Sequence, residues 1–317
     1  MLKPIIKTLA VTATTAVSVS SLLAAEPASP SASTTGPTDT TAQMGTASGW
    51  MFQVSGDYFH FDIDTTGGGQ LSSSSIKGDL YGGSVYLKAP FMKVDDWLEL
   101  SYRHGSLDGT GFGGAPAFAL ANVHSDLDQV QLQYRWGFLK VPKTTSPSLK
   151  VDLLVGAEYL GFQETDTLGA NYYWSSLFPA NATGNNVRKV DDSYVMFRAG
   201  LSGTWYFWTK WSEDASKRFR IGLRGEALGG AGARIVDLTN ADANTLDANG
   251  ISKTSANLAY NFTGKGLLYA DYKMGNLSFL LEGGYQWMEY WSTVQGEADS
   301  TAIMKGPFVR VGIGYAF

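Results

Sequence analysis

Cysteine is absent from the 317-residue chain, and histidine occurs only three times. The absence of cysteine excludes a disulfide framework, thiolate catalysis, metal sites built on sulfur ligands and the lipid attachment of a lipoprotein. Basic residues are also scarce, because 24 lysine and arginine residues face 29 acids, for a formal net charge of -5. This balance is not that of a protein that binds nucleic acid.

Long apolar runs are missing too, with one exception at the start of the chain. Lys3 and Lys7 precede a Ser/Thr-diluted apolar stretch over residues 9–23 and then small residues, which is the layout of a secretory signal peptide. We expect residues 1–25 to be this signal, cleaved after Ala25 and exported by the Sec route. An uncleaved anchor helix is the alternative, but the stretch is shorter than the roughly 20 residues that span a bilayer.

The next segment, residues 26–48, offers almost nothing that a folded core would bury. Its sequence, EPASPSASTTGPTDTTAQMGTAS, is dominated by Pro, Ser, Thr and Ala. Such a composition is typical of disordered segments. We therefore expect a disordered tether at 26–48 and a folded domain at 49–317.

The folded domain repeats one pattern, in which apolar or aromatic residues alternate with polar ones. Successive side chains of a β-strand point to opposite faces, so this pattern predicts strands with one apolar and one polar face. About ten such segments occur. In the clearest, at 128–138, the alternating sets are Val130, Leu132, Tyr134, Trp136 and Phe138 against Gln129, Gln131, Gln133 and Arg135.

The connections between these segments alternate in length. Those after the second, fourth, sixth and eighth segments are mostly short, such as 273–276, whereas the others are mostly longer, such as 107–126 and 165–192. Short turns on one rim and long loops on the other are typical of a transmembrane β-barrel, whose tilted strands span a bilayer in about 9–11 residues. A soluble sandwich would not need this asymmetry.

The fold prediction is therefore an all-β, transmembrane, antiparallel up-and-down barrel of about ten strands, with the termini on the short-turn side. Eight or twelve strands are the alternatives. Twelve would follow if residues 171–179 began an extra hairpin.

The last segment, at 306–317, explains how such a sheet would close. Hydrocarbon offers no water to an open strand edge, so the last strand must pair with the first. Its outward positions are Val311, Ile313, Tyr315 and Phe317. In these residues the chain resembles bacterial outer-membrane β-barrel proteins, in which such a strand with a terminal Phe is read by the assembly machinery.

The resemblance covers the architecture of residues 49–317 and no narrower family. It implies a location in the cell outer membrane, with outer-membrane lipid and the outer-membrane assembly machinery as partners. Residues 26–48 would then be a periplasmic tether.

The polar faces of the strands would line the lumen. The predicted lumen network comprises Asp57, Glu99, Arg103, Arg135, Asp152, Glu158, Arg198, Arg220, Arg224, Glu226, Glu282 and Arg310. Such charges stay ionised only when they are paired or wet. A ten-strand barrel is close to the size that side chains fill, and the inward parity also includes Leu154, Leu160, Leu280, Met288 and Phe308. We predict a largely plugged lumen; the alternative is a narrow porin for small anionic solutes, favoured by an excess of bases.

The predicted loops are acidic, and one of them is apolar. The segment at 171–179 contains Tyr172, Tyr173, Trp174 and Phe178, which suggests contact with the barrel mouth, the lumen or an extracellular ligand. Asp237, Asp242 and Asp247 could bind a divalent cation, but their spacing is not that of a helix-loop-helix calcium site. A solvated acidic loop is the preferred interpretation. We predict no metal and no cofactor, and the oligomeric state stays open.

A barrel enzyme is the rival class. Outer-membrane proteases of the omptin type use Asp and His residues high on the wall, and the candidates here are His60, Asp62, Asp64, His104, Asp108, His124, Asp126 and Asp128. Such a site needs an Asp pair and a His/Asp pair on facing walls. All three His residues lie in the first half of the domain, and His60 and His104 have outward parity.

The motifs of other hydrolases are missing as well, because the chain contains neither GxSxG nor HExxH. We predict a non-enzymatic protein with a structural or surface-interaction role. An omptin-like rim protease is the remaining alternative.

Overall fold

The computed structural model describes residues 49–66, 75–92, 96–112, 120–141, 148–168, 186–212, 216–240, 254–292 and 300–317. Ten strands run through these segments: β1 (Met51–Thr66), β2 (Ser75–Lys88), β3 (Trp97–Phe112), β4 (Leu120–Val141), β5 (Ser148–Leu168), β6 (Asn186–Trp211), β7 (Lys217–Asn240), β8 (Thr254–Met274), β9 (Leu277–Ser292) and β10 (Ser300–Ala316). Among these residues, no helix is long and apolar enough to cross a membrane.

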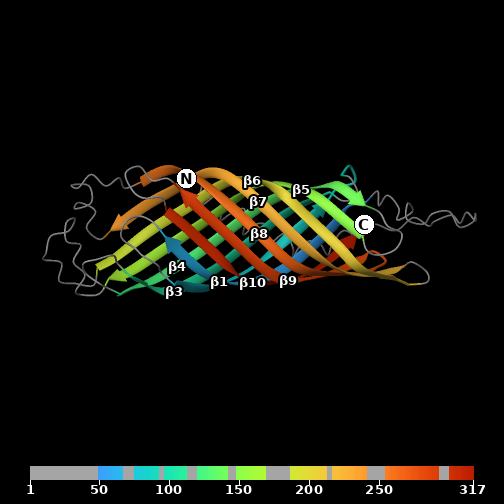
Figure 1. Ribbon diagram of the computed structural model, residues 1–317, viewed down its shortest axis with the longest axis horizontal. Helices are drawn as coiled ribbons and strands as arrows, with labels where there is room; N and C mark the ends of the chain where they lie inside the picture. Colours follow the sequence, from blue (N-terminus) through green and yellow to red (C-terminus); the bar gives the residue numbers. More distant parts are fainter. Residues whose placement is uncertain are drawn as a thin grey trace, which may run out of the picture. The chain divides into compact units, whose positions relative to one another are not determined.

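Each strand pairs antiparallel with its neighbours in chain order, and β1 pairs with β10, so the sheet closes into a barrel (Figure 1). The predicted up-and-down barrel of ten strands is confirmed. The alternatives of eight and twelve strands are wrong for the described part of the chain. Residues 171–179, on which the twelve-strand alternative depended, lie outside it.

The strands are longer than a bilayer requires. The shortest, β2, has 14 residues and the longest, β6, has 26, whereas about 9–11 residues of tilted strand cross the hydrocarbon. Hydrogen bonds between paired strands do not depend on lipid, so the hairpins continue beyond the membrane into water.

Closure depends on the pairing of β1 with β10. The register joins Met51 to Ala316, and the Phe317 backbone N–H donates to the Trp50 carbonyl at 2.8 Å. At the same rim, a two-residue turn joins β8 and β9, and its Gly275 has a φ of 56°. Glycine adopts this left-handed conformation without a Cβ clash. The start of β1, the end of β10 and the short turns therefore share one rim, as predicted.

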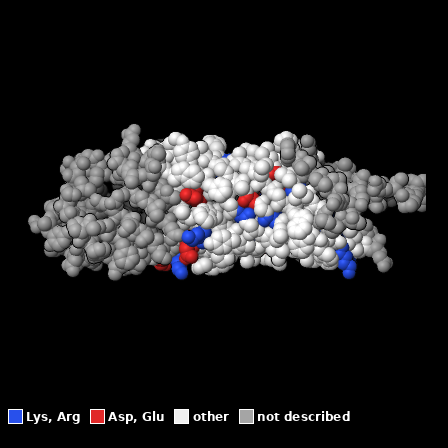
Figure 2. Space-filling view, in the orientation of Figure 1, with Lys and Arg blue, Asp and Glu red and all other residues white. Residues whose placement is uncertain are grey.

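The two faces of the sheet have opposite chemistry. Large apolar side chains such as Leu132 and Phe197 are exposed on the outer wall, whereas Arg103 and Glu158 are buried inside. Figure 2 shows that uncharged residues dominate the described surface on one side of the barrel. This arrangement reverses that of a soluble protein and suits a hydrocarbon solvent outside.

The alternation along β6 fails near its short-turn end. The register of β6 and β7 shifts between Tyr206 and Trp208, and consecutive residues Phe207 and Trp208 are both exposed. A β-bulge adds one residue to one strand of a pair and turns the following side chains over. It therefore places an additional indole on the outer wall near the short-turn rim.

The outward position of Leu132 generates a first prediction. Leu132→Arg should impair insertion into lipid vesicles, because arginine at the bilayer midplane on the lipid face costs about 2–4 kcal/mol. Heat-dependent gel mobility after folding into vesicles measures the assembled fraction. Gln133→Arg is the matched control, since Gln133 has lumen parity on the same strand, and it should assemble normally. Equal assembly of the two variants would contradict the assignment of the faces.

Candidate functional site: the filled lumen

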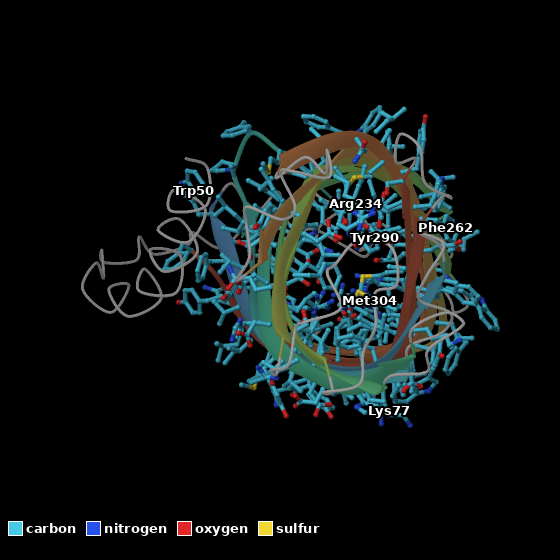
Figure 3. All side chains as sticks on the ribbon, turned by 90° about the vertical axis from the view of Figure 1, so that its left-hand side faces the viewer. Trp50, Lys77, Arg234, Phe262, Tyr290 and Met304 are labelled. Atoms are coloured by element: carbon cyan, nitrogen blue, oxygen red, sulfur yellow. The ribbon has the colours of Figure 1, made fainter. Side chains whose placement is uncertain are left out.

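The lumen receives every second side chain from ten strands. All twelve residues of the predicted lumen network lie on its inner face, and they come from β1, β3, β4, β5, β6, β7, β9 and β10. Viewed along the barrel axis, side chains occupy the interior, with Arg234, Tyr290 and Met304 inside the ring and Trp50, Lys77 and Phe262 outside it (Figure 3).

Arg103 and Arg310 form the first group of contacts in the network. The Arg103 Nε donates to the Asp57 carboxylate, and Arg310 lies 3.8 Å from the same carboxylate. Arg310 also contacts Glu99 at 3.3 Å and Glu282 at 3.5 Å. Arg310 therefore contacts carboxylates from three strands and shares Asp57 with Arg103, which ties β1, β3, β9 and β10 together inside the barrel.

Arg135 is the centre of a second group. Its guanidinium contacts Glu226 at 2.7 Å and Asp152 at 3.2 Å. On the next strands, Arg224 Nη1 donates to Glu282 Oε1 at 2.6 Å. Since Glu282 also contacts Arg310, Arg224 is joined to the first group.

Glu158 is the hydrogen-bond acceptor at the centre of a third group of contacts, on the opposite wall of the barrel. Its carboxylate accepts hydrogen bonds from Gln129 at 2.6 Å, Gln131 at 2.7 Å and Asn261 at 2.9 Å, and it contacts Arg198 at 3.0 Å. Three amide donors and one guanidinium compensate for the desolvation of a single buried carboxylate.

Arg220 is the network member nearest the short-turn rim on β7. Its Nε donates to Asp271 at 2.8 Å, and its guanidinium lies 4.2 Å from the centre of the Tyr206 ring. Arg224 makes the same contact with Tyr269. Cation–π contacts of this kind strengthen when water is excluded. The aromatic rings therefore hold the arginine side chains in place and fill space between them.

A second set of inward residues was predicted only in small part. Fifteen buried side chains form an apolar cluster inside the barrel: Phe59, Phe61, Ile63, Leu80, Leu107, Leu127, Leu160, Tyr194, Met196, Ala259, Leu267, Met288, Tyr290, Met304 and Phe308. Of these, only Leu160, Met288 and Phe308 were predicted from the sequence, together with the buried Leu154 and Leu280. On β1, β3, β5, β6, β9 and β10 the cluster lies on the long-loop side of the lumen network.

A reversal of the alternation was the missed signal. In residues 59–63 the inward positions become apolar while the outward positions become His60 and Asp62. The same reversal occurs around Leu107, which precedes Asp108, and around Leu127, which lies between two Asp residues. Beyond the bilayer the outer wall meets water, so the barrel there is polar outside and apolar inside.

No protein-family model matches the chain, and no curated protein matches it. Solved structures share the barrel architecture. The outer membrane protease OmpT from Escherichia coli is 10% identical, covers 84% of this chain and 97% of its own, and has a TM-score of 0.44.

Two autotransporter domains give similar values. The transport unit of AIDA-I from Escherichia coli is 11% identical over 85% of this chain and 90% of its own, with a TM-score of 0.37. The translocator domain of NalP from Neisseria meningitidis is 10% identical over 85% and 89%, with a TM-score of 0.29. These likenesses concern the fold and carry no information about activity.

Closure of the sheet, an apolar outer wall and a charged interior occur together only in barrels that span a membrane. The protein is an outer-membrane β-barrel. The predicted location in the outer membrane is confirmed. The fold is that of the bacterial outer-membrane β-barrel proteins that the sequence resembles.

The residues of the predicted assembly signal lie on the outer wall of this barrel. Val311, Ile313, Tyr315 and Phe317 are all exposed on β10 or directly after it. The rings of Tyr315 and Phe317 meet edge to face with centroids 4.9 Å apart. The four loop residues Tyr172, Tyr173, Trp174 and Phe178 lie outside the described residues, as do Asp242 and Asp247.

The rim candidates for catalysis do not converge on the lumen. His60, His104 and His124 all lie on the outer wall, and each imidazole Nδ1 is paired with an Asp of the neighbouring strand: Asp79 at 2.8 Å, Asp128 at 2.9 Å and Asp108 at 2.6 Å. Among the described residues, no group of three or more His, Asp or Glu side chains could hold a metal ion. The arrangement therefore places three paired imidazoles on the outer wall.

The lumen network generates a second prediction. Arg103→Met should lower the free energy of unfolding by about 3–5 kcal/mol, because the buried Asp57 loses its closest cation. Urea unfolding in lipid vesicles measures this change. The double variant Asp57→Asn/Arg103→Met removes the stranded charge and should be more stable than the single variant. A double variant no more stable than Arg103→Met would contradict the ion-pair account.

His124 generates a third prediction, about pH. It lies beyond Asp126 and Asp128, outside the apolar stripe of β4, and its hydrogen bond to Asp108 raises the pKa of the imidazole above its ordinary value. The pair therefore stabilises the fold below the ordinary histidine pKa, and this contribution disappears as pH rises through the raised one. Nuclear magnetic resonance titration should show a raised pKa in the native protein, and Asp108→Asn should return it toward the ordinary value. An unchanged titration in Asp108→Asn would exclude the pair as its cause.

Proposed function

We propose that this barrel is a closed, non-enzymatic outer-membrane protein with a structural or surface-interaction role, rather than a pore. The filling of the lumen by two successive sets of side chains carries this proposal. Arg103 of β3 reaches Gln286 of β9 at 3.3 Å, across the barrel. The apolar cluster then lies between this network and the long-loop rim. A solute would have to break ion pairs and then pass a constriction that excludes water.

A plugged lumen moves the functional surface to the outer wall and the loops. The extracellular loops are the part of an outer-membrane barrel that varies most freely, since the sheet fixes the rest. The loop at 171–179, with its three consecutive aromatic residues, is the segment we propose for contact with an extracellular ligand. Its apolar side chains gain more from burial against a partner than from hydration.

The absence of catalysis is part of the same proposal. A water-activating imidazole must face the space that the substrate occupies. Here His104 and His124 bond Asp side chains on the outer wall. Turnover of a peptide substrate that is lost in His104→Ala or His124→Ala would replace this proposal with the rim protease.

Single-channel conductance in a planar bilayer gives the fourth prediction and tests the proposal directly. The purified folded protein should produce no discrete steps. The variant Phe61→Ala/Arg103→Ala/Met288→Ala/Tyr290→Ala removes side chains from both the apolar cluster and the ion-pair network and should produce steps, which shows that the assay detects an open lumen. Leu258→Ala/Phe262→Ala, with both changes on the outer wall, is the matched control and should stay silent.

Reproducible anion-selective steps from the unaltered protein would overturn the proposal. The excess of bases over acids in the wall would then line a narrow channel. In that case the narrow porin becomes the function.

A further inference from the structure

The hairpin of β6 and β7 extends beyond β5 at the short-turn rim (Figure 1). β6 pairs with β7 as far as Trp211, but with β5 only as far as Tyr206. β8 accompanies β7 to this end, where Met274 pairs with Lys217. The inner faces of these three strands therefore form one side of the mouth through which the lumen opens at this rim.

The inner face of β7 and β8 carries a cluster of charges at the mouth. Arg220 Nε donates to Asp271 Oδ2 at 2.8 Å, and Arg218 Nη2 donates to Asp271 Oδ1 at 3.2 Å. Lys273 lies two residues beyond Asp271 on β8 and therefore has the same inward parity. Three cations and one carboxylate give this cluster a net charge of +2.

The other inward acids of this wall are committed to different bases. Deeper in the lumen, Glu226 contacts Arg135 at 2.7 Å, and Glu282 contacts Arg224 at 2.6 Å. Asp152 of β5 also contacts Arg135, at 3.2 Å. Among the described residues, no further acid lies on the inner faces of β6 to β9 at the mouth, so the cluster keeps its positive charge.

The register sets two of these cations against each other. Arg218 on β7 is the direct partner of Lys273 on β8. Like charges at directly opposed positions of antiparallel strands repel each other and destabilise the pair. In the part of the chain that the structure describes, the Lys273 ammonium forms no ion pair. An anion beside both groups would turn this repulsion into attraction.

Arg220 presents its donors in a fixed orientation. Its guanidinium carbon lies 4.2 Å from the centre of the Tyr206 ring. Its hydrogen bond to Asp271 uses Nε, and neither of its Nη groups donates to a described residue. A guanidinium held in this way binds phosphate or carboxylate groups through two parallel hydrogen bonds.

Trp211 adds an apolar surface to the same face. The register shift between Tyr206 and Trp208 turns Trp211 inward, where it pairs with Arg218; without the bulge it would point toward lipid. Its ring centre lies 5.6 Å from the Arg218 guanidinium carbon, and 44% of the residue is exposed. An indole in this position offers a flat contact to the carbon skeleton of a ligand.

The cluster is partly withdrawn from water but still open to it. The side chains of Arg218 and Arg220 are 18% and 23% exposed, and that of Asp271 is 9% exposed. Charges in such a position attract an anion more strongly than fully hydrated ones. The ion pairs deeper in the lumen lie behind them, so a solute reaches the cluster from the short-turn side.

We propose that Arg218, Arg220 and Lys273 bind the phosphate of a small phosphate monoester at the short-turn mouth, with the organic part of the ligand on Trp211. The three cations surround a single carboxylate, which favours one compact dianionic group over two separated charges. A phosphate monoester carries a charge near -2 at neutral pH, which matches the charge of the cluster. The short turns of an outer-membrane barrel face the periplasm, so the ligand is a periplasmic solute.

This site is at the opposite rim from the loops of the proposed function, so neither proposal depends on the other. Phenyl phosphate is the probe, because it combines the dianion with a ring. Saturation transfer difference nuclear magnetic resonance, on the folded full chain in maltoside micelles, measures its dissociation constant. Saturable binding is expected, and benzyl alcohol, which has a ring and no phosphate, should not bind at this site.

The fifth prediction compares two lysines of this rim. Lys273→Met should weaken phenyl phosphate binding about tenfold, because one charge-assisted contact is lost. Lys217→Met is the matched control, since Lys217 is exposed next to Arg218 but has outward parity. It should leave the dissociation constant within about twofold, because salt screens a charge on the far side of the sheet. Heat-dependent gel mobility shows that each variant is folded.

Two further variants separate binding from a structural role of the cluster. Asp271→Asn should strengthen phenyl phosphate binding, because the carboxylate competes with the ligand for both guanidinium groups. Trp211→Ala should weaken binding of phenyl phosphate and leave that of inorganic phosphate unchanged. Cations that only stabilise the fold would produce neither result.

Three outcomes would overturn the proposal. One is the absence of saturable phenyl phosphate binding by the unaltered protein. Another is an equal loss of binding in Lys273→Met and Lys217→Met, which would show general attraction to a basic rim. The third concerns Glu213 and Asp214 of the β6–β7 connection, which lie outside the described residues. Binding that appears only in Glu213→Gln/Asp214→Asn would show that the chain's own acids neutralise the cluster.

Discussion

The alternation of side chains along a strand, in a sheet whose outside is hydrocarbon, is the constraint on which this structure depends. It requires each strand to place apolar residues outward and leaves the polar half of the chain to face an enclosed lumen. Ten strands enclose little space, so the inward charges cannot all reach water. They meet each other instead, as Arg135 meets Asp152 and Glu226. The network of ion pairs in the lumen therefore follows from the apolar outer wall.

The network also determines which substitutions the lumen can accept. A buried ion pair gains little over a well-packed apolar pair, because desolvation offsets the Coulomb attraction. Loss of one partner is expensive, since the other charge stays buried. Arg310, which contacts three carboxylates, can lose none of them without leaving its own charge less compensated. A lumen of this kind resists single changes and is hard to convert into a channel by small steps.

The sequence predicted the fold and the twelve charged lumen residues because both follow from the alternation. Strand number, closure and inward parity need only the period of two and the lengths of the connections. It did not predict which acid meets which base, since Arg135 meets Glu226, 91 positions away, through the curvature of the barrel. The predicted loop residues lie outside the described part of the chain, so no structural result bears on them.

The apolar cluster was missed for a different physical reason. The prediction assumed hydrocarbon around the whole outer wall, but part of the wall faces water. On β1, the change from Tyr58 to His60 outside accompanies the change from Asp57 to Phe59 inside. Above this level the barrel obeys the rules of a soluble protein, with polar residues outside and a core within. A search for reversals of the alternation would have found it.

This reversal connects the plug to the membrane. Where the outer wall becomes polar, the interior must supply the apolar core that holds the sheet together in water, and that core closes the lumen. β6 and β8 do not follow this rule, because Met196 and Ala259 belong to the apolar cluster while the neighbouring Phe197 and Leu258 are exposed on the outer wall. Apolar residues on both faces at one level need an apolar environment outside as well. The same reasoning that explains the closed lumen on β1 to β4 therefore requires the outer wall of β8 to be covered.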